Sequence, residues 1–198
     1  FLEFNIDRME IDTSKELPVK LMQNVGSPDI SFSASLLPHK GIGLARLEFI
    51  ITNYIKIHPL ALCDYPHIKE DVREKIYNTI GENDDGKWYF VKRLSRGIAK
   101  IASAFYPEDV IVRFSDFKSN EYKNLIGGEI YEPEEENPMI SWRGASRYYS
   151  EEYSRAFELE CMAIHYVRTV MKCENVIVMI PFCRTPEECN KVLDTMKK

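Results

Sequence analysis

The sequence lacks the features by which membrane, secreted and nucleic-acid-binding proteins are usually identified. No apolar run approaches the ~18 residues that cross a bilayer, and we expect neither a membrane span nor a signal peptide. Positive charge is not in excess, because 26 Lys and Arg stand against 31 Asp and Glu and give a formal net charge of −5. The chain therefore has no general electrostatic attraction to nucleic acid or anionic lipid. A binding site for an anion has to come from a few cations held at one place.

Cysteines are few, odd in number and irregularly spaced, and they form no C-x-x-C pair. This distribution predicts reduced thiols in a cytoplasmic protein instead of a disulfide framework. No repeat or low-complexity linker divides the 198 residues, so we expect one sizeable domain. Because the sequence starts at Phe1 without a methionine and stops at Lys198 within an unfinished pattern, we interpret it as a piece of a longer chain. The cysteines are Cys63, Cys161, Cys173, Cys183 and Cys189.

What the chain does contain is an alternation of short apolar runs and helical patterns. Apolar residues at every third or fourth position predict helices over 67–80, 88–105 and 150–171, the last with Ser150 as its N-cap. The acidic run 132–136 is typical of a solvated loop. Strands that alternate with helical crossovers indicate an α/β fold in which helices cover a parallel sheet. About five strands are predicted, with an additional helical excursion between the second and the third. Their ranges are 19–25, 42–48, 110–115, 139–142 and 175–182.

Arginines lie at or just beyond the ends of three predicted strands. They are Arg46, Arg113 and Arg143. The C-terminal ends of the strands form the rim that carries the site of a parallel barrel, and three guanidiniums on one rim can hold a phosphate together with a carboxylate. Spacing alone is a weak signal, because an arginine in such a chain is usually a surface residue. Glu48 and Asp116 follow Arg46 and Arg113 closely, so each either orients that guanidinium or forms a salt bridge without a role.

Five stretches of the sequence carry a resemblance to a known family. They are GIGLARLEFI, VIVRFSDFKSNEY, EEENPMISWRGASRY, AFELECMAI and NVIVMIPFCRT. Together, from about Val19 onward and in the same order, they resemble the phosphoenolpyruvate synthases, a branch of the PEP-utilising enzyme family. The resemblance implies a partial TIM (β/α)8 barrel. Residues 1–198 would then form the N-terminal portion of the PEP/pyruvate-binding barrel domain.

The resemblance also implies a reaction and a role for the three arginines. The full enzyme would be a pyruvate, water dikinase of gluconeogenesis, which converts ATP, pyruvate and water to AMP, phosphoenolpyruvate and phosphate through a phosphohistidine on another domain. By resemblance, Arg46 and Arg113 bind the phosphoryl and carboxylate groups of the substrate, and Arg143 is a third contact in the same pocket. A cytoplasmic homodimer is implied as well.

The sequence departs from the family in what it lacks. The glutamate and aspartate that hold Mg²⁺ in the family lie in M-x-x-E-x-P and G-S-N-D-L-x-Q stretches, and its proton-donating cysteine lies in a G-x-C-G-Q stretch; none of these occurs here. The domains that carry the phosphohistidine and bind ATP do not occur either. We therefore expect neither a metal ligand nor a catalytic residue in this chain, with Mg²⁺ bound only in the full-length enzyme.

Other assignments stay open. The chain could be a non-catalytic half-barrel that serves as a dimerisation or regulatory module, since barrels of this family pair as homodimers. It could also be a relative of pyruvate phosphate dikinase or of enzyme I of the sugar phosphotransferase system, although SDFKSNEY and EEENP fit the synthases better. An incomplete barrel further predicts that the first and last strands expose backbone edges, which self-association or a terminal segment would cover.

Overall fold

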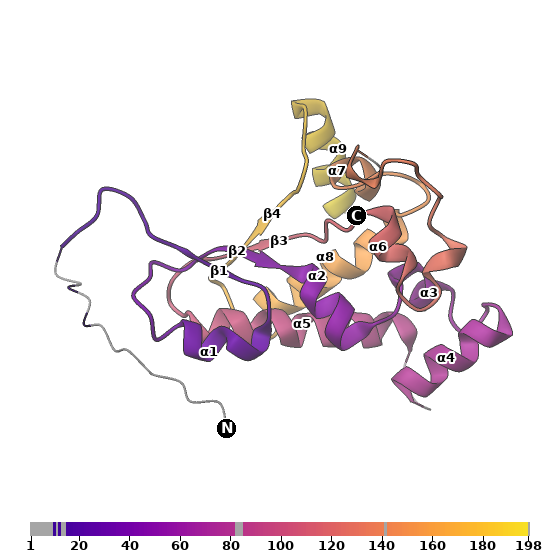
Figure 1. The fold of residues 1–198 in the computed structure, drawn as a ribbon, viewed down its shortest axis with the longest axis horizontal. Helices are drawn as coiled ribbons and strands as arrows, with labels where there is room; N and C mark the ends of the chain where they lie inside the picture. The colour runs from indigo at the N-terminus through magenta and orange to yellow at the C-terminus, as the bar shows by residue number, and fades with distance from the viewer. Residues whose placement is uncertain (1–9, 11, 13–14, 82–84, 141, 198) are drawn as a thin grey trace, which may run out of the picture.

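A parallel sheet lies at the centre of the computed structural model, which describes residues 10, 12, 15–81, 85–140 and 142–197 (Figure 1). Within these residues the sheet has four strands in the order β1-β2-β3-β4, so each strand pairs with the one that precedes it in the chain. The strand order runs in one direction across the sheet. Because crossovers between parallel strands are right-handed, the helices of all these crossovers lie on one face. The strands are β1 (Gln23–Val25), β2 (Ile42–Arg46), β3 (Val110–Arg113) and β4 (Val176–Met179).

Helices connect the strands and fill most of the remaining chain. The α-helices are α1 (Ser31–Ala34), α2 (Leu47–Ile50), α3 (Pro59–Asp64), α4 (Glu70–Ile80), α5 (Gly86–Ala104), α6 (Ser119–Lys123), α7 (Ala145–Tyr148), α8 (Ser154–Thr169) and α9 (Pro186–Met196). Shorter turns are η1 (Pro28–Ile30), η2 (Ile51–Ile55, a π-helical turn), η3 (Gly128–Ile130) and η4 (Pro138–Ile140). The segment from α2 to α5 is the predicted helical excursion between the second and third strands. Figure 1 shows α1 and α5 together below the sheet, and α5 packs against both α1 and α8.

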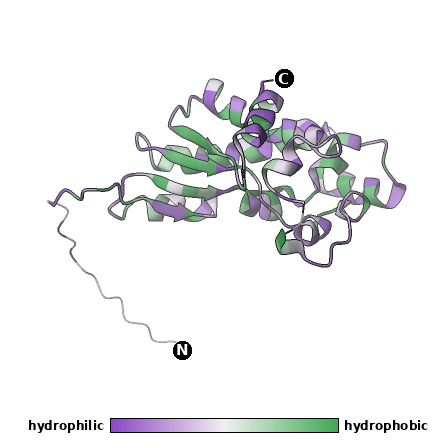
Figure 2. Cartoon of the chain, turned by 90° about the horizontal axis from the view of Figure 1, so that it is seen from above, coloured by the Kyte–Doolittle hydropathy of each residue, from purple (hydrophilic) through white to green (hydrophobic). Residues whose placement is uncertain are grey.

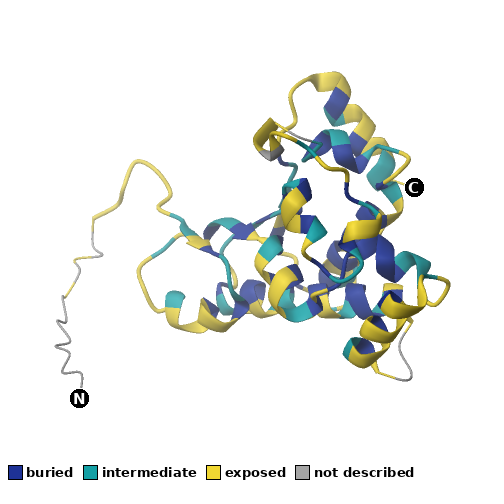
Figure 3. Cartoon of the chain, turned by 45° about the vertical axis from the view of Figure 1, so that its right-hand side comes forward, coloured by how far each residue is buried: buried dark blue, intermediate teal, exposed yellow. Residues whose placement is uncertain are grey.

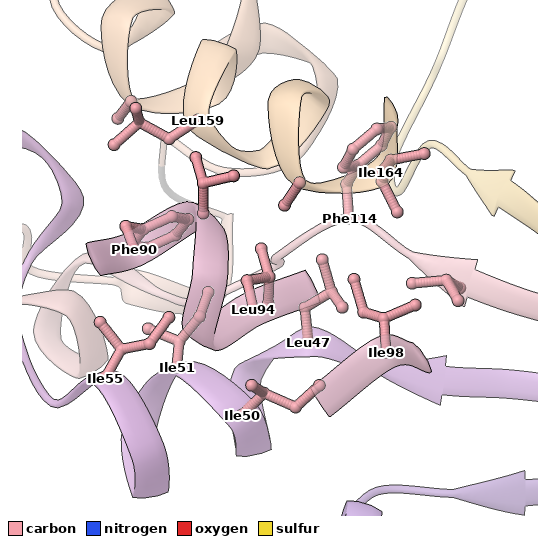
Figure 4. Packing of buried hydrophobic residues seen from close by; sticks show 14 of the residues in the cluster. Leu47, Ile50, Ile51, Ile55, Phe90, Leu94, Ile98, Phe114, Leu159 and Ile164 are labelled. Atoms are coloured by element: carbon pink, nitrogen blue, oxygen red, sulfur yellow. The ribbon is translucent and has the colours of Figure 1, made fainter. Parts of the chain in front are cut away.

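Helix α5 forms the centre of the apolar core (Figure 4). Its start is fixed by Asp85, whose side chain accepts a hydrogen bond of 2.9 Å from the backbone N–H of Lys87. Residues one turn apart on this helix are fully buried against side chains of α2 and α8. Burial of each such side chain stabilises the fold by about 2 kcal/mol. The labelled core side chains of these three helices are Leu47, Ile50, Phe90, Leu94, Ile98, Leu159 and Ile164.

The two faces of the sheet differ in how well they are covered. Ile42, Val110 and Val176 are register partners and are fully buried on the helical side. The next residue of β4, Ile177, points to the opposite face and is 44% exposed. Figures 2 and 3 show the strands as predominantly hydrophobic and the outer surfaces of α1 and α4 as predominantly exposed. We call the side that carries Ile177 the uncovered sheet face.

The predicted strand at 139–142 is wrong. Pro138–Ile140 form a 3-10 turn instead, and Met139 and Ile140 are 62% and 84% exposed. Asn137 explains the difference, because its side chain accepts a hydrogen bond from the Met139 N–H at 3.1 Å and its carbonyl accepts one from the Ile140 N–H at 3.3 Å. Local turn bonds therefore satisfy the backbone groups that a sheet would have used.

The other predicted strands are present but shorter. The run 19–25 pairs only from Gln23 onward, and Val19 and Leu21 are 71% and 59% exposed. The predicted strand 42–48 stops at Arg46, because α2 begins with the next residue. Of the predicted strands 110–115 and 175–182, only the residues of β3 and β4 are extended and paired. In the described residues β1 pairs only with β2, and β4 pairs only with β3. The sheet is therefore open, and a closed barrel is not confirmed. No described helix is both long enough and apolar enough to cross a membrane.

The predicted helices are confirmed, although each starts a few residues from its predicted position. The patterns over 67–80 and 88–105 correspond to α4 and α5. Helix α8 begins at Ser154, and the N-cap position is Tyr153. Ser150 accepts a hydrogen bond from the Tyr153 N–H at 3.2 Å, so it stabilises the turn before α8 and does not cap the helix itself. All five cysteines are free thiols.

Candidate functional site

Two of the predicted site residues lie side by side at the carboxyl edge of the sheet. Arg46 ends β2 and Arg113 ends β3, and the two are register partners in the parallel pair. Paired residues of neighbouring strands point to the same face, so both guanidiniums belong to one surface. The carboxyl ends of parallel strands are where ligands bind in α/β proteins.

The third predicted residue reaches the same edge without a strand of its own. Arg143 lies in the loop before α7, and this loop is joined to the end of β4 by a 3.0 Å hydrogen bond from the Ala145 N–H to the Pro181 carbonyl. Its guanidinium lies over the ring of Phe182, 4.8 Å from the ring centre. The approach requires Gly144, because a Cβ there would come within 2.8 Å of both Phe182 and the Pro181 carbonyl oxygen.

Asp116 joins two of the arginines. Arg143 donates from Nε to Oδ1 at 3.0 Å and from Nη2 to Oδ2 at 2.9 Å, a bidentate pair, while Arg113 Nη1 lies 3.6 Å from Oδ2. The Asp116 side chain is only 2% exposed, so water screens these pairs weakly. Its hydrogen bonds raise the pKa of Arg143 above the ordinary value of a guanidinium.

Glu48 fixes the same arrangement from α2. Its Oε1 accepts hydrogen bonds of 2.7 Å from Arg113 Nη2 and of 2.7 Å from the Asp116 backbone N–H. The sequence pattern suggested Arg46 as its partner on the strand. The chain turns into α2 directly after Arg46, which carries Glu48 to the neighbouring strand's arginine instead.

The cluster keeps unused capacity for an anion. Three guanidiniums and two carboxylates leave one net positive charge, in a chain whose overall charge is −5. Arg46 is exposed, stacks 4.4 Å from the ring centre of Phe49, and takes part in none of the ion pairs found among the described residues. Arg113 Nε is buried without a hydrogen-bond partner. A buried donor of this kind costs free energy unless a ligand accepts from it.

The described residues do not suit a magnesium ion. No group of three His, Cys, Asp or Glu side chains in that part of the chain could hold a metal. The two carboxylates at the cluster, Glu48 and Asp116, are already engaged by guanidiniums.

A buried triad behind the cluster was not predicted from the sequence. Arg147 is 1% exposed and contacts Glu132 through both terminal nitrogens, one of them at 3.0 Å. Glu132 also accepts a hydrogen bond of 2.8 Å from His58 Nε2. His58 Nδ1 accepts from the Leu60 N–H at 3.2 Å, so the neutral ring carries its proton on Nε2. Burial lowers the pKa of His58 despite the neighbouring carboxylate.

The triad holds the backbone next to Arg143. Arg147 Nη1 donates to the Trp142 carbonyl at 3.3 Å, and its guanidinium carbon lies 4.3 Å from the Trp142 ring centre. The rings of Tyr122 and Tyr153 lie at 4.1 and 4.3 Å. The acidic run 132–136, which the sequence predicts to be a solvated loop, therefore begins with a buried carboxylate, that of Glu132. No pattern in the sequence distinguishes Arg147 from Arg143, because the rings around it come from separate segments.

The chain is similar to known proteins over nearly its whole length. Residues 5–198 match the family model described as "PEP-utilising enzyme, PEP-binding domain". Proteins named phosphoenolpyruvate synthase are 52% identical over 198 residues in Helicobacter pylori, 46% over 197 residues in Escherichia coli and 44% over 243 residues in Aquifex aeolicus. These alignments cover 99–100% of this chain but 24%, 25% and 28% of the relatives. The chain thus spans about a quarter of the length of the relatives it matches.

Proposed function

The chain belongs to the PEP-utilising enzyme family through its PEP-binding domain, and we propose that its arginine cluster binds phosphoenolpyruvate and pyruvate in a phosphoenolpyruvate synthase. The observation that carries this proposal is the pairing of Arg46 and Arg113 at the carboxyl edge of the sheet, with an exposed guanidinium on one and an unpartnered Nε on the other. Phosphoenolpyruvate carries a phosphate and a carboxylate, and each suits a guanidinium that donates two hydrogen bonds.

The chain's own residues would act by positioning and by neutralising charge. Arg46, which has no carboxylate partner among the described residues, suits the phosphoryl group, and Arg113 with Arg143 suits the carboxylate. Glu48 and Asp116 fix the guanidiniums in direction before a ligand arrives, so binding orders few side chains. Phosphoryl transfer depends mainly on such placement of charge.

The whole protein is proposed to be a pyruvate, water dikinase with ATP and a phosphohistidine on other domains. Mg²⁺ in such an enzyme would neutralise charge on the transferred phosphoryl group, and its ligands are expected outside the residues described here. We propose that the open sheet is part of a TIM (β/α)8 barrel, which the sequential strand order supports. A cytoplasmic homodimer completes the proposal, and the five free thiols favour that location.

A second candidate is a non-catalytic module that pairs with another copy or a partner. The exposed Ile177 and the single-sided pairing of β1 and β4 favour it. Assay of the whole protein separates the candidates, because a synthase yields AMP and phosphoenolpyruvate from pyruvate and ATP. Dependence on pyrophosphate or on a phosphocarrier protein would assign the chain to a sister branch of the family.

Calorimetry on the chain itself tests the anion site. We expect weak binding of phosphoenolpyruvate, and at least about tenfold weaker binding after Arg113→Ala because charge-assisted hydrogen bonds are lost. Arg73→Ala is the matched control, since Arg73 forms an exposed ion pair with Glu70 on α4. Equal affinity of Arg113→Ala and the unaltered chain would refute the site.

A further inference from the structure

A buried carboxylate lies directly behind the arginine cluster and is not used by the binding site itself. Glu160 of α8 is 0% exposed. Its Oε2 accepts a hydrogen bond of 3.0 Å from the Ser115 backbone N–H, and its Oε1 accepts one from the Ser115 hydroxyl. Among the ion pairs of the described residues, none includes Glu160. A carboxylate buried without a cation is costly and is typical of functional regions.

Ser115 determines where the site's acid lies. It stands between Phe114 and Asp116 in the loop after β3, so its backbone position sets that of Asp116. The Tyr148 hydroxyl donates to the Ser115 carbonyl. Glu160 therefore holds the peptide unit before the Ser115 Cα and Tyr148 holds the one after it, which leads to Asp116 and its contacts with Arg113 and Arg143.

The hydroxyl groups around Glu160 form a directed chain of hydrogen bonds. Tyr153 donates to Tyr122 at 2.7 Å, the hydroxyls of Tyr122 and Ser115 are 2.7 Å apart, and Ser115 donates to Glu160. With an ionised carboxylate, every donor in this chain has an acceptor. A proton on Oε2 would remove the acceptor of the Ser115 N–H. A proton on Oε1 would reverse the chain and leave the Tyr153 hydroxyl without an acceptor among these groups.

Charged side chains from two neighbouring elements face Glu160, together with buried tyrosine hydroxyls. Burial is the largest influence on Glu160, and all influences together leave its pKa raised to about 7; Glu48 of α2 acts in the same direction as burial, and Arg147 of α7 acts in the opposite direction. The Ser115 hydrogen bonds also act to lower the pKa. Tyr122 of α6 and Tyr148 of α7 have pKa values well above 10 because they are buried, so both hydroxyls stay neutral. Within this group, Glu160 is the side chain whose charge changes near neutral pH.

We propose that Glu160 is a positioning residue of the arginine cluster: its ionised carboxylate holds Ser115, and so Asp116, in the place that aligns Arg113 and Arg143 for an anionic ligand. This inference rests on the proposed function for the ligand but on the described contacts for the positioning. It implies that the affinity of the site for a dicarboxylate falls when Glu160 takes up a proton.

Calorimetry with oxalate tests the proposal, because oxalate keeps both negative charges over the range used. From about pH 8 to about pH 6, the affinity of the unaltered chain is expected to fall about fivefold, the effect of one lost hydrogen bond. Glu160→Gln should bind oxalate weakly and equally at both pH values, since an amide has no charge to lose. Glu158→Gln is the control, because Glu158 is exposed on the same helix and should leave the profile unchanged. If Glu160→Gln keeps the profile of the unaltered chain, the proposal is wrong.

A second measurement separates this proposal from the proposed function. The backbone amide resonances of Ser115 and Asp116 should shift with a midpoint near pH 7 in the unaltered chain and should not shift in Glu160→Gln. If the amides titrate in this way but oxalate does not bind at any pH, the proposed function fails and the positioning role stands. If these amides do not titrate in the unaltered chain, the positioning role is refuted whatever oxalate does.

Discussion

At the scale of single residues, the proposed anion site depends as much on its acids as on its arginines. Asp116 contacts both Arg113 and Arg143, and Glu48 contacts Arg113 and the backbone of Asp116. Two carboxylates thus fix guanidiniums that would otherwise sample many rotamers. Because the arginine side chains are already ordered, binding of a ligand would cost little further side-chain entropy.

The buried acid Glu160 gives a residue-scale prediction about stability. Its pKa is about 7 in the folded chain against 4.5 as its ordinary value, so the folded state holds a proton that the unfolded state has lost between these values. The contribution of Glu160 to stability is therefore complete below about pH 4.5 and is lost as the pH rises to about 7, a change of up to about 3 kcal/mol. Relative to the unaltered chain, Glu160→Gln should gain stability by that order between about pH 5 and about pH 8.

Urea denaturation of both proteins at the two pH values measures this difference. Comparing the two chains cancels the titration of other groups, including His58, whose lowered pKa acts in the opposite direction. Glu158→Gln should show no pH-dependent difference, because its side chain is exposed. A constant difference between Glu160→Gln and the unaltered chain across the range would contradict the prediction.

The sequence predicts the arginines of the candidate site but not the residues behind them. Arg46 and Arg113 end apolar runs that form the strands β2 and β3, so their place at the carboxyl edge of the sheet follows from the pattern. The burial of Arg147 is not, because it depends on rings of Tyr122, Trp142 and Tyr153 that meet only in the folded chain. The burial of Glu132 is not predictable for the same reason, because its partners His58 and Arg147 come from separate segments.

At the scale of elements, local signals predicted helices better than strands. The start of α9 shows such a local signal, because Thr185 accepts from the Glu188 N–H at 3.1 Å and Pro186 follows it in the first turn. The strand at 139–142 failed because a turn centred on Asn137 satisfies the local backbone groups. Strand pairing depends on distant partners, and a short apolar pair carries little information about them.

The cap of α9 gives an element-scale prediction. Thr185→Ala should lower the free energy of unfolding by about 1 kcal/mol, because the hydroxyl that accepts from the first helical turn is lost. Thr195→Ala is the control on the same helix, since the Thr195 hydroxyl bonds only to the Lys191 carbonyl on an exposed surface. Chemical denaturation of the three chains measures the effect. Equal losses at the two positions would show that the capping bond adds nothing.

At the scale of the whole molecule, the part of the chain that the structure describes leaves sheet edges and apolar side chains uncovered. In the described residues β1 and β4 have unpaired outer edges, and the uncovered sheet face exposes Ile177. Phe32 and Leu36 near β1 are 76% and 79% exposed. Such edges and patches promote association between chains.

We therefore expect the isolated chain to self-associate. Light scattering should show a molar mass that rises with concentration, and Ile177→Lys should shift this rise to higher concentration, because a charge on the uncovered sheet face opposes pairing. Lys191→Arg, a change on the exposed side of α9, should leave the rise unchanged. A compact monomer at every concentration, with amide protons protected on both β1 and β4, would rule the expectation out.

The strand order has a consequence for how the protein is made. Since β2, β3 and β4 each pair with the strand made before them, the sheet can extend in step with synthesis on the ribosome. Arg46 and Arg113 come together as soon as β3 has emerged. Arg143 acquires its platform only when Phe182 has been translated, so the third arginine is the last to be fixed. A pause in translation between β3 and β4 would yield a nascent chain in which two of the three arginines of the proposed anion site are in place.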